Sequence, residues 1–264
     1  MSHFVFEIGV EEMPARFLPL LDRELRERFS ALLSEAGLDY AGVTTASTPR
    51  RLVVDITGLA AVQKTEQIVV SGPPVRIALD ADGKPTKAGL GFAKSQNVDF
   101  GQVYVEKTDK GEYLALKKTV GGRSAAEILA ETCAAVLPGL TFPKKMQWMG
   151  KECTFGRPVR WLMAMLDDQV VPFVFAGLTA ANETRGHRVM GPGPFAVPHA
   201  DAYARILHDQ GRVVLDTADR KAAIRVEGDR LAAEVGGSVE WSESLLDQVA
   251  NLVESPRAML GGFH

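Results

Sequence analysis

The chain has 264 residues, 46% of them hydrophobic and 24% charged, which is typical of an ordinary globular protein. Its formal net charge of −3 excludes a strongly basic protein that coats nucleic acid, so any nucleic-acid contact must come from local basic patches. The absence of a long apolar run, of a signal peptide and of a disulfide framework predicts a cytoplasmic protein without membrane contact, whose two cysteines are free thiols.

The first part of the chain is predicted to mix strands with helices. Residues 4–10 alternate as a strand, and apolar residues from Leu18 to Leu32 recur at helical spacing before Gly37. Residues 50–59 and 66–73 read as two further strands. A short helix is expected over residues 88–94, after a turn-rich segment.

Two hairpins and a capped helix follow. Residues 103–116 contain two alternating runs joined through "TDKG", which predicts a hairpin. Ser124 and Glu127 have the spacing of a capping box, so a helix should start there and stop at Pro138. The second hairpin should turn at residues 167–168.

The last part of the chain is predicted to be mainly helical. Helices are expected over residues 200–210, 217–235 and 244–253, with a short strand at 212–215. Strands and helices do not alternate strictly, so we expect an α+β fold with mixed antiparallel sheets and hairpins packed with several helices. A boundary after the capped helix would divide the chain into regions 1–140 and 141–264. The apolar pattern that resumes after Pro256 indicates a piece of a longer chain.

Three short segments concentrate cations beside turn residues and aromatics. They are "STPRRL" with Arg50 and Arg51, "FPKKMQWMGKECTFGRPVRW" with Lys144, Lys145, Lys151, Arg157 and Arg160, and "TRGHRVMG" with Arg185, His187 and Arg188. Arginine matches phosphate oxygens bidentately, and lysine supplies a point charge. The glycines and the proline around the third segment would let its backbone approach a ligand closely.

Each segment also has a simpler interpretation. The cations can be a solvated surface, and Trp148 and Trp161 can be core or interface anchors rather than platforms for stacked bases. The acidic residues Glu7, Glu11 and Glu12 stand near a strand end, where they can act as general acid and base, bind a metal, cap a helix or form salt bridges. Metal-binding, phosphate-loop and nucleophile motifs are absent from the sequence, so no catalytic set is predicted.

The order of several motifs resembles the N-terminal part of the bacterial glycyl-tRNA synthetase beta subunit, from about Phe4 to Pro256. The motifs are "EIGVEEMP", "TPRRL", "DGKPTKAGLGFA", "TDKGEYL", "FPKKMQW", "FGRPVRW", "TRGHRVMG" and "SESLLDQVANLVESP". The resemblance implies an enzyme built from separate alpha and beta chains. In such an enzyme the alpha chain would make glycyl-adenylate from glycine and ATP at a class II active site, and the beta chain would be needed for tRNA recognition and charging.

The same resemblance sets the expected partners and cofactors. The partners would be the alpha subunit and tRNA-Gly. ATP and Mg²⁺ would bind on the alpha subunit, and no cofactor or metal is expected on this chain. The complete beta chain of the family is longer and carries an anticodon-binding region toward its C-terminus.

Three functional hypotheses remain open at this point. The first is a tRNA-binding and assembly module, in which the basic residues contact tRNA or the alpha partner. The second is a structural scaffold, in which Trp148 and Trp161 form a protein interface and the cations are its rim. The third is a small hydrolytic enzyme that uses Glu11, Glu12 and His187 as acid–base groups.

Overall fold

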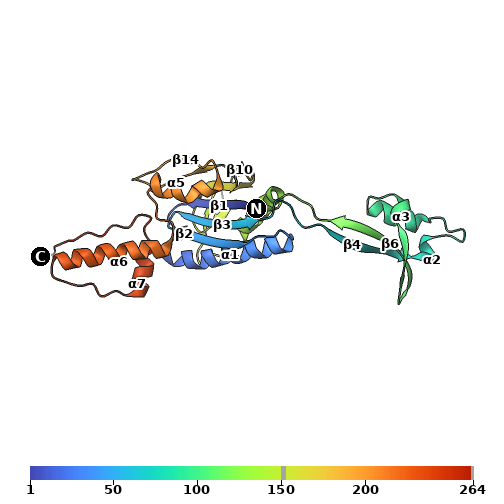
Figure 1. Cartoon of the computed structure of the whole chain (residues 1–264), viewed down its shortest axis with the longest axis horizontal. Helices are drawn as coiled ribbons and strands as arrows, with labels where there is room; N and C mark the ends of the chain where they lie inside the picture. The colour runs from blue at the N-terminus through green and yellow to red at the C-terminus, as the bar shows by residue number, and fades with distance from the viewer. Residues whose placement is uncertain (150–152, 263–264) are drawn as a thin grey trace. The chain divides into compact units, whose positions relative to one another are not determined.

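The computed structural model describes residues 1–149 and 153–262, which fall into two compact units (Figure 1). The sheet unit combines Met1–Gln63 with Arg123–His264, and the inserted unit is Lys64–Gly122. The boundary expected at residue 140 falls within the sheet unit, directly after helix α4 (Ala125–Gly139). The chain therefore leaves the sheet unit after its third strand and returns to it before α4.

The sheet unit is built on a five-stranded antiparallel sheet with the order β10-β9-β1-β3-β2. Its strands are β1 (Ser2–Val10), β2 (Gly42–Thr48), β3 (Arg51–Leu59), β9 (Val159–Leu166) and β10 (Gln169–Val170). The strands predicted at residues 4–10 and 50–59, and the hairpin turning at residues 167–168, are confirmed. Strand β1 is central, with β3 on one side and β9 on the other.

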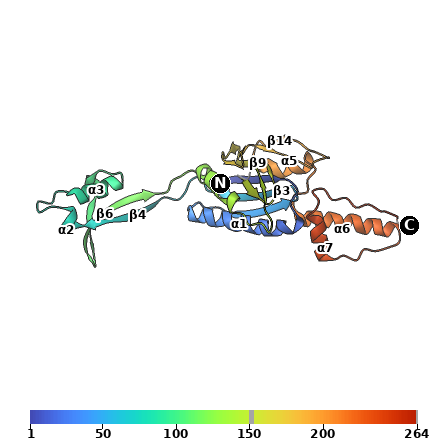
Figure 2. The same ribbon diagram turned by 180° about the vertical axis from the view of Figure 1, so that it is seen from behind.

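Both faces of this sheet are covered, as Figures 1 and 2 show from opposite sides. Helices α1 (Leu18–Glu35) and α4 contribute to the larger core with alternate residues of β1 such as Phe6. The intervening residue Val5 faces a second core that includes Tyr203 of α5 (Tyr203–Asp209). Because strand side chains alternate between faces, β1 supplies apolar residues to both layers.

Local signals explain where the two main helices begin and end. Pro19 lies in the first turn of α1, where its missing N–H costs no helical hydrogen bond. Gly37, with φ of +62°, follows the last turn, as predicted. Helix α4 begins with the predicted capping box of Ser124 and Glu127. The predicted stop is also confirmed, because Pro138 and Gly139 form its end.

The inserted unit holds a three-stranded antiparallel sheet with the order β4-β6-β5. Its elements are β4 (Glu66–Pro74), α2 (Val75–Ala78), α3 (Lys87–Ser95), a 3-10 turn (Phe100–Gln102), β5 (Tyr104–Thr108) and β6 (Gly111–Val120). The hairpin predicted through "TDKG" is β5 and β6. The side chain of Thr86 caps α3 by accepting from the N–H of Ala88.

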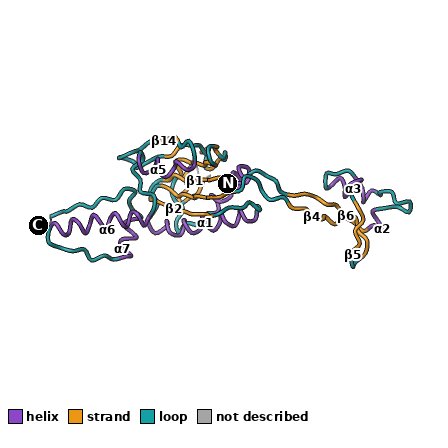
Figure 3. The backbone as a smooth tube through the Cα atoms, viewed as in Figure 1, coloured by secondary structure: helices purple, strands orange, loops and turns teal. Residues whose placement is uncertain are grey.

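The remaining elements of the sheet unit are short hairpins and C-terminal helices (Figure 3). The hairpins are β7 (Met146–Trp148) with β8 (Cys153–Phe155), β11 (Val174–Phe175) with β12 (Leu178–Thr179), and β13 (Glu183–Thr184) with β14 (Phe195–Ala196). A 3-10 turn (Ala200–Ala202) precedes α5, and the last helices are α6 (Thr217–Glu234) and α7 (Glu243–Ala250). Among the described residues, none of the helices combines the length and apolar character needed to cross a membrane.

The strand predicted at residues 212–215 is wrong. This segment is a loop in which Arg212 has φ of +55° and Val213 is buried. The N–H of Val213 donates to Leu207, and that of Val214 donates to Glu254, so neither enters a strand ladder. The apolar run reflects burial of a loop under the second core rather than a sheet partner.

Buried Arg220 fixes α6 to the rest of the sheet unit. Its guanidinium donates to the carbonyls of Ala250, Val214, Leu215 and Ser47, at 2.7–2.9 Å. These carbonyls belong to the end of α7, the loop before α6 and strand β2. One side chain therefore joins the C-terminal helices to the sheet.

Candidate functional site

The candidate site begins with a row of three residues on adjacent strands. Gly9 of β1 lies opposite Arg51 of β3 and opposite Trp161 of β9. Residues directly opposite one another in antiparallel strands project to the same face. On one face of the sheet, the row therefore places a cationic side chain and an aromatic ring on either side of a glycine, which has no side chain.

The missing side chain of Gly9 lets the indole of Trp161 lie across the central strand. A Cβ atom at residue 9 would stand only 1.9 Å from the indole. Trp161 is 7% exposed, and the guanidinium carbons of Arg50 and Arg51 lie 5.8 and 5.7 Å from its ring centroid. These distances are within the range of cation–π attraction.

Beneath this surface, Arg51 joins two buried carboxylates. Its Nη1 lies 2.8 Å from Glu7 Oε1, and its Nε and Nη2 each lie 3.0 Å from Glu254 Oε1. The side chains of Arg51 and Glu7 are 0% exposed, and that of Glu254 is 4% exposed. Burial raises the pKa of Glu7, an effect that Arg51 and a hydrogen bond from Thr184 oppose. Removal of Arg51, or of the carboxylates, would leave the opposite charge without this partner in the interior. The fold therefore requires Arg51 and the carboxylates together.

The same network holds the basic loop, which we define as residues 185–193. Arg51 Nη1 donates to the carbonyl of Arg185 at 2.6 Å, and Arg50 Nη1 donates to that of Gly186 at 3.1 Å. A Cβ on Gly186 would come within 2.1 Å of the Gly191 carbonyl and 2.3 Å of Gly211. Glycine at residue 186 therefore allows the backbone segments to pack closely. This packing and the two hydrogen bonds from Arg50 and Arg51 hold the backbone of the basic loop in place.

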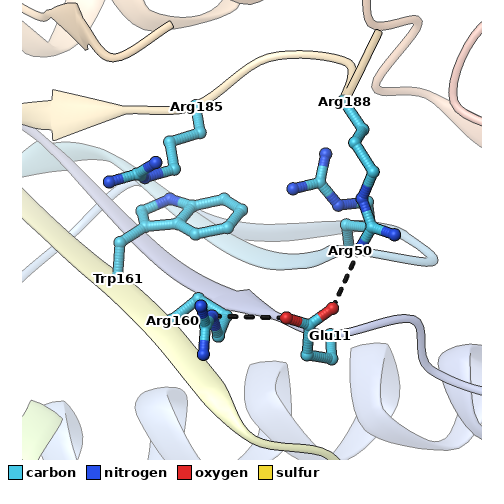
Figure 4. Close-up of a pocket in the computed structure, with 6 residues that line it drawn as sticks. All are labelled: Glu11, Arg50, Arg160, Trp161, Arg185 and Arg188. Atoms are coloured by element: carbon cyan, nitrogen blue, oxygen red, sulfur yellow. Dashed lines mark hydrogen bonds and ion pairs between the residues drawn. The ribbon is translucent and has the colours of Figure 1, made fainter. Parts of the chain in front are cut away.

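Four arginines and one carboxylate surround the resulting hollow, which we call the arginine cleft (Figure 4). Its volume is about 380 Å³, and its lining residues are Glu11, Arg50, Arg160, Trp161, Arg185 and Arg188. Figure 4 shows Arg185 alongside the indole of Trp161, while Glu11 lies between Arg160 and Arg188. The cleft thus gathers residues from the end of β1, the turn before β3, strand β9 and the basic loop.

The cleft carries an excess of positive charge. Glu11 Oε1 lies 3.3 Å from Arg160 Nε, and Glu11 Oε2 lies 2.9 Å from Arg188 Nη2. Arg185 is exposed and makes no ion pair within the described chain. Burial lowers the pKa of Arg50, and neighbouring Arg51 and Arg188 act in the same direction, although Glu254 opposes them. An oxyanion that entered the cleft would relieve this repulsion.

A second hollow of about 290 Å³ shares the side chains of Arg50 and Arg188 with the arginine cleft. Its lining combines His187, Val189 and Leu252 with polar groups that include Glu12 and Glu254. Val189 is 80% exposed and Leu252 is 62% exposed, so the wall is partly apolar. The ring of His187 is turned toward its own loop, because its Nδ1 accepts from the N–H groups of Val189 and Met190.

The structure brings together only part of the set of candidates from the sequence. Arg50, Arg160, Arg185 and Arg188 line the arginine cleft, while His187 borders the second hollow. Arg51 lies below the cleft and is fully buried, so it supports the loop instead of presenting charge to a partner. Lys144, Lys145 and Arg157 line neither hollow, and Lys151 lies outside the described residues.

The aromatics also separate into different roles. Phe142 and Phe155 belong to the larger core, with ring centroids 4.5 Å apart. Trp148 is partly buried against that core, and Trp161 forms the floor of the cleft. Trp148 thus keeps part of its surface exposed, whereas Trp161 is buried at 7% exposure.

Sequence reasoning missed Glu254 and Gly9 as parts of this site. Glu254 is about 200 residues from Arg51, and a lone glutamate in "LVESP" carries no signal of a buried ion pair. Gly9 matters only because Trp161 is its neighbour in the sheet. Strand pairing could have revealed that row, but the pairing of β1 with β9 is not readable from periodicity.

The carboxylates around the cleft are engaged in ion pairs with its arginines. Glu11 and Glu12 are both paired with Arg188, and Glu11 is also paired with Arg160. In the part of the chain that the structure describes, no three His, Cys, Asp or Glu side chains form a group that could hold a metal ion. Guanidinium groups around an open cleft can bind phosphate or carboxylate oxygens through charge-assisted hydrogen bonds.

Comparison with known proteins places this site in a family. A family model described as glycyl-tRNA synthetase beta subunit matches residues 4–264. A glycine–tRNA ligase beta subunit of Oleidesulfovibrio alaskensis is 50% identical over 263 residues, which is 100% of this chain and 38% of that protein. Corresponding subunits of Solidesulfovibrio magneticus and Moorella thermoacetica are 49% and 42% identical, over 100% and 98% of this chain.

The chain spans 38% of the length of the first of these relatives and 37% of the length of the Moorella protein. The match nonetheless covers the whole cleft, from Glu11 to the loop around Arg188 and on to Glu254. The expectation drawn from the order of motifs is confirmed. The chain belongs to the glycyl-tRNA synthetase beta subunit family.

Proposed function

We propose that the chain is the N-terminal part of the beta subunit of a glycine–tRNA ligase and that its arginine cleft contacts the backbone of tRNA-Gly. In this proposal the chain also takes part in assembly with a catalytic alpha subunit, which charges tRNA-Gly with glycine at the expense of ATP. The observation that carries the RNA contact is the convergence of Arg50, Arg160, Arg185 and Arg188 on one cleft in a chain of net charge −3. Such local concentration of cations is what phosphate recognition by an acidic protein requires.

The lining of the cleft supports the proposal that ATP and Mg²⁺ bind elsewhere in the enzyme. Mg²⁺ prefers carboxylate and water oxygens. Glu11 is the one carboxylate among the described lining residues, and both of its oxygens face arginines. The residues of the cleft therefore do not fit a magnesium–nucleotide complex, and we propose that ATP and Mg²⁺ bind on the alpha subunit.

A scaffold without direct RNA contact is the second candidate. It is favoured by exposed apolar side chains, namely Val189 and Met190 within the basic loop and Leu252 in the lining of the second hollow. Apolar residues beside arginines are common in protein interfaces. Under this alternative the second hollow would receive the alpha subunit, and the arginines would form its polar rim.

The experiment is a titration of the chain with tRNA-Gly and an unrelated tRNA at several salt concentrations. Replacement of Arg185 and Arg188 by alanine should weaken binding and reduce the salt slope by roughly 0.9 for each phosphate group that is no longer bound. A matched control replaces Arg23 and Arg230, two exposed arginines that line neither hollow and whose replacement removes the same charge.

The two candidates give different results in this titration. Binding that is weakened in the Arg185 and Arg188 variant, but kept in the Arg23 and Arg230 control, supports the RNA contact. An absence of binding at low salt, together with co-purification of the alpha subunit that Val189→Asp abolishes, supports the scaffold. Equal weakening in both arginine variants would reduce the effect to net charge and contradict the assignment of the cleft.

A further inference from the structure

We propose that the arginine cleft is a phosphate-binding site in which the carboxylate of Glu11 holds the place of the ligand and is displaced by an incoming phosphate group. The inference rests on the RNA contact proposed above. It adds the chemical group that the cleft takes and a side chain of the protein that competes for the same donors.

The geometry of Glu11 is that of a bridging oxyanion. Its two oxygens contact two different guanidinium groups, Arg160 at 3.3 Å and Arg188 at 2.9 Å, which come from β9 and from the basic loop. A phosphate group presents at least two free oxygens, so it can bridge the same pair of donors. Glu11 therefore marks a position between the two arginines where negative charge is stabilised.

The pairs that Glu11 makes can be exchanged. Its side chain is 39% exposed, and those of Arg160 and Arg188 are 61% and 52% exposed. Ion pairs this exposed contribute little net stability, because water competes for both partners. The contrast is with Arg51 and Glu7, which are 0% exposed and cannot separate without leaving buried charge.

The backbone allows Glu11 to leave without unfolding the site. Its N–H donates to the carbonyl of Pro158 at 3.0 Å, so the main chain at the end of β1 stays fixed. The side chain then needs only a rotamer change to point to solvent. Arg188 keeps a second partner during this exchange, because its Nη1 lies 3.2 Å from Glu12.

The remaining groups of the cleft supply further donors for a ligand. Arg50 also lines the cleft, and Arg185 is exposed alongside the ring of Trp161. A phosphate that replaces Glu11 would thus meet more positive charge than Glu11 neutralises. Displacement of Glu11 would also make the cleft selective for anions that bind the arginines tightly, since any ligand must compete with the carboxylate.

The test compares Glu11→Gln with Glu12→Gln in the 264-residue chain, using inorganic pyrophosphate as the probe. Both variants remove one negative charge and a partner of Arg188, but only Glu11 lines the arginine cleft. Tryptophans are replaced biosynthetically by 5-fluorotryptophan, and the ¹⁹F resonance of Trp161 is identified by its disappearance in Trp161→Phe. Its position in the free variants also reports whether the cleft is intact.

We expect Glu11→Gln to bind pyrophosphate roughly fivefold more tightly than the parent chain, which equals about 1 kcal/mol at 1.4 kcal/mol per decade. Glu12→Gln should change the affinity by less than about twofold. Equal effects of the two variants would reduce the result to long-range charge and overturn the proposal. Unchanged or weaker binding by Glu11→Gln would overturn it as well.

Two RNA hairpins of one sequence, with and without a 5′-phosphate, identify the source of the phosphate. If the unphosphorylated RNA shows the same dependence on Glu11, the ligand is the backbone phosphodiester; if only the 5′-phosphorylated RNA and pyrophosphate show it, the ligand is a terminal phosphate. If pyrophosphate responds to Glu11→Gln but neither RNA nor tRNA-Gly binds, the proposed function fails and the phosphate site stands. If tRNA-Gly binding requires Arg185 and Arg188, but Glu11→Gln changes neither pyrophosphate binding nor RNA binding, the proposed function is supported and this inference is refuted.

Discussion

Replacement of Arg51 by methionine should destabilise the sheet unit more than replacement of any arginine that lines the cleft. Methionine fills much of the same volume but donates no hydrogen bond, so Glu7 and Glu254 would lose their shared partner. The carbonyl of Arg185 would lose its donor as well. Arg160 and Arg188, in contrast, are more than half exposed, so their removal should change stability little.

The size of the effect follows from burial. Removal of one member of a buried ion pair typically costs about 3–5 kcal/mol, because the other charge remains in the interior without compensation. Burial already raises the pKa of Glu7, and Arg51 limits that rise. Without Arg51, Glu7 would take up a proton at higher pH, and a carboxyl with a raised folded-state pKa stabilises the fold as pH falls. The cost of Arg51→Met should therefore be near the full value at pH 8 and smaller at pH 5.

Urea unfolding followed by tryptophan fluorescence measures this cost. All three tryptophans of the chain lie in the sheet unit, so the signal reports that unit and not the inserted one. Adding Glu7→Gln to Arg51→Met should recover part of the stability, because one unpaired charge is removed. A cost below about 1 kcal/mol that is the same at pH 5 and pH 8 would refute the reasoning.

Two further changes test other parts of the sheet unit. Burial raises the pKa of Asp22 to about 6, despite the hydrogen bond from Ser47 and the charge of Arg220. Because Asp22 holds its proton more tightly in the folded state than in the unfolded state, the parent chain should lose stability as pH rises. The loss should reach up to about 3 kcal/mol between pH 4 and pH 7. Asp22→Asn should lack this slope in urea unfolding, and an identical slope in the variant would count against the assignment. Gly9→Ala should displace the indole of Trp161 and lower the free energy of unfolding by about 1–3 kcal/mol. The ¹⁹F signal of fluorinated Trp161 should shift as well. An unchanged signal and an unchanged stability would mean that the strands at this position tolerate a Cβ atom on residue 9.

The elements that could be predicted from the sequence are those with a clear period or cap. Alternation identified β1, the recurrence of Leu21, Leu25 and Phe29 identified α1, and the capping box identified α4. Strand β2 was missed because "GVTTAST" has small and hydroxyl side chains in place of apolar alternation. It forms nonetheless, because β3 offers it an edge and α1 packs on it, with Ser47 donating to Asp22 of α1.

The site could be predicted only as a collection of basic segments. Arg50, Arg185 and Arg188 stood out because they lie beside glycine and proline, and they do meet in one cleft. The pairing of Arg188 with Glu11, and the burial of Arg51 between Glu7 and Glu254, depend on contacts between residues more than 40 positions apart. Local sequence patterns carry no information about such contacts. Only the tertiary structure determines which arginine is buried and which is exposed.

The central position of β1 has a consequence for the synthesis of the chain on the ribosome. One neighbour of β1 is β3, which ends at Leu59, but the other is β9, which ends at Leu166. At a translation rate of about 5–20 residues per second, roughly 5–20 s separate the emergence of the two partners. During that interval one edge of β1 has no strand to pair with, and its row Arg51–Gly9 has no Trp161 to cover it. The nascent chain therefore exposes the unpaired backbone N–H and C=O groups of one edge of β1 until β9 emerges to pair with them.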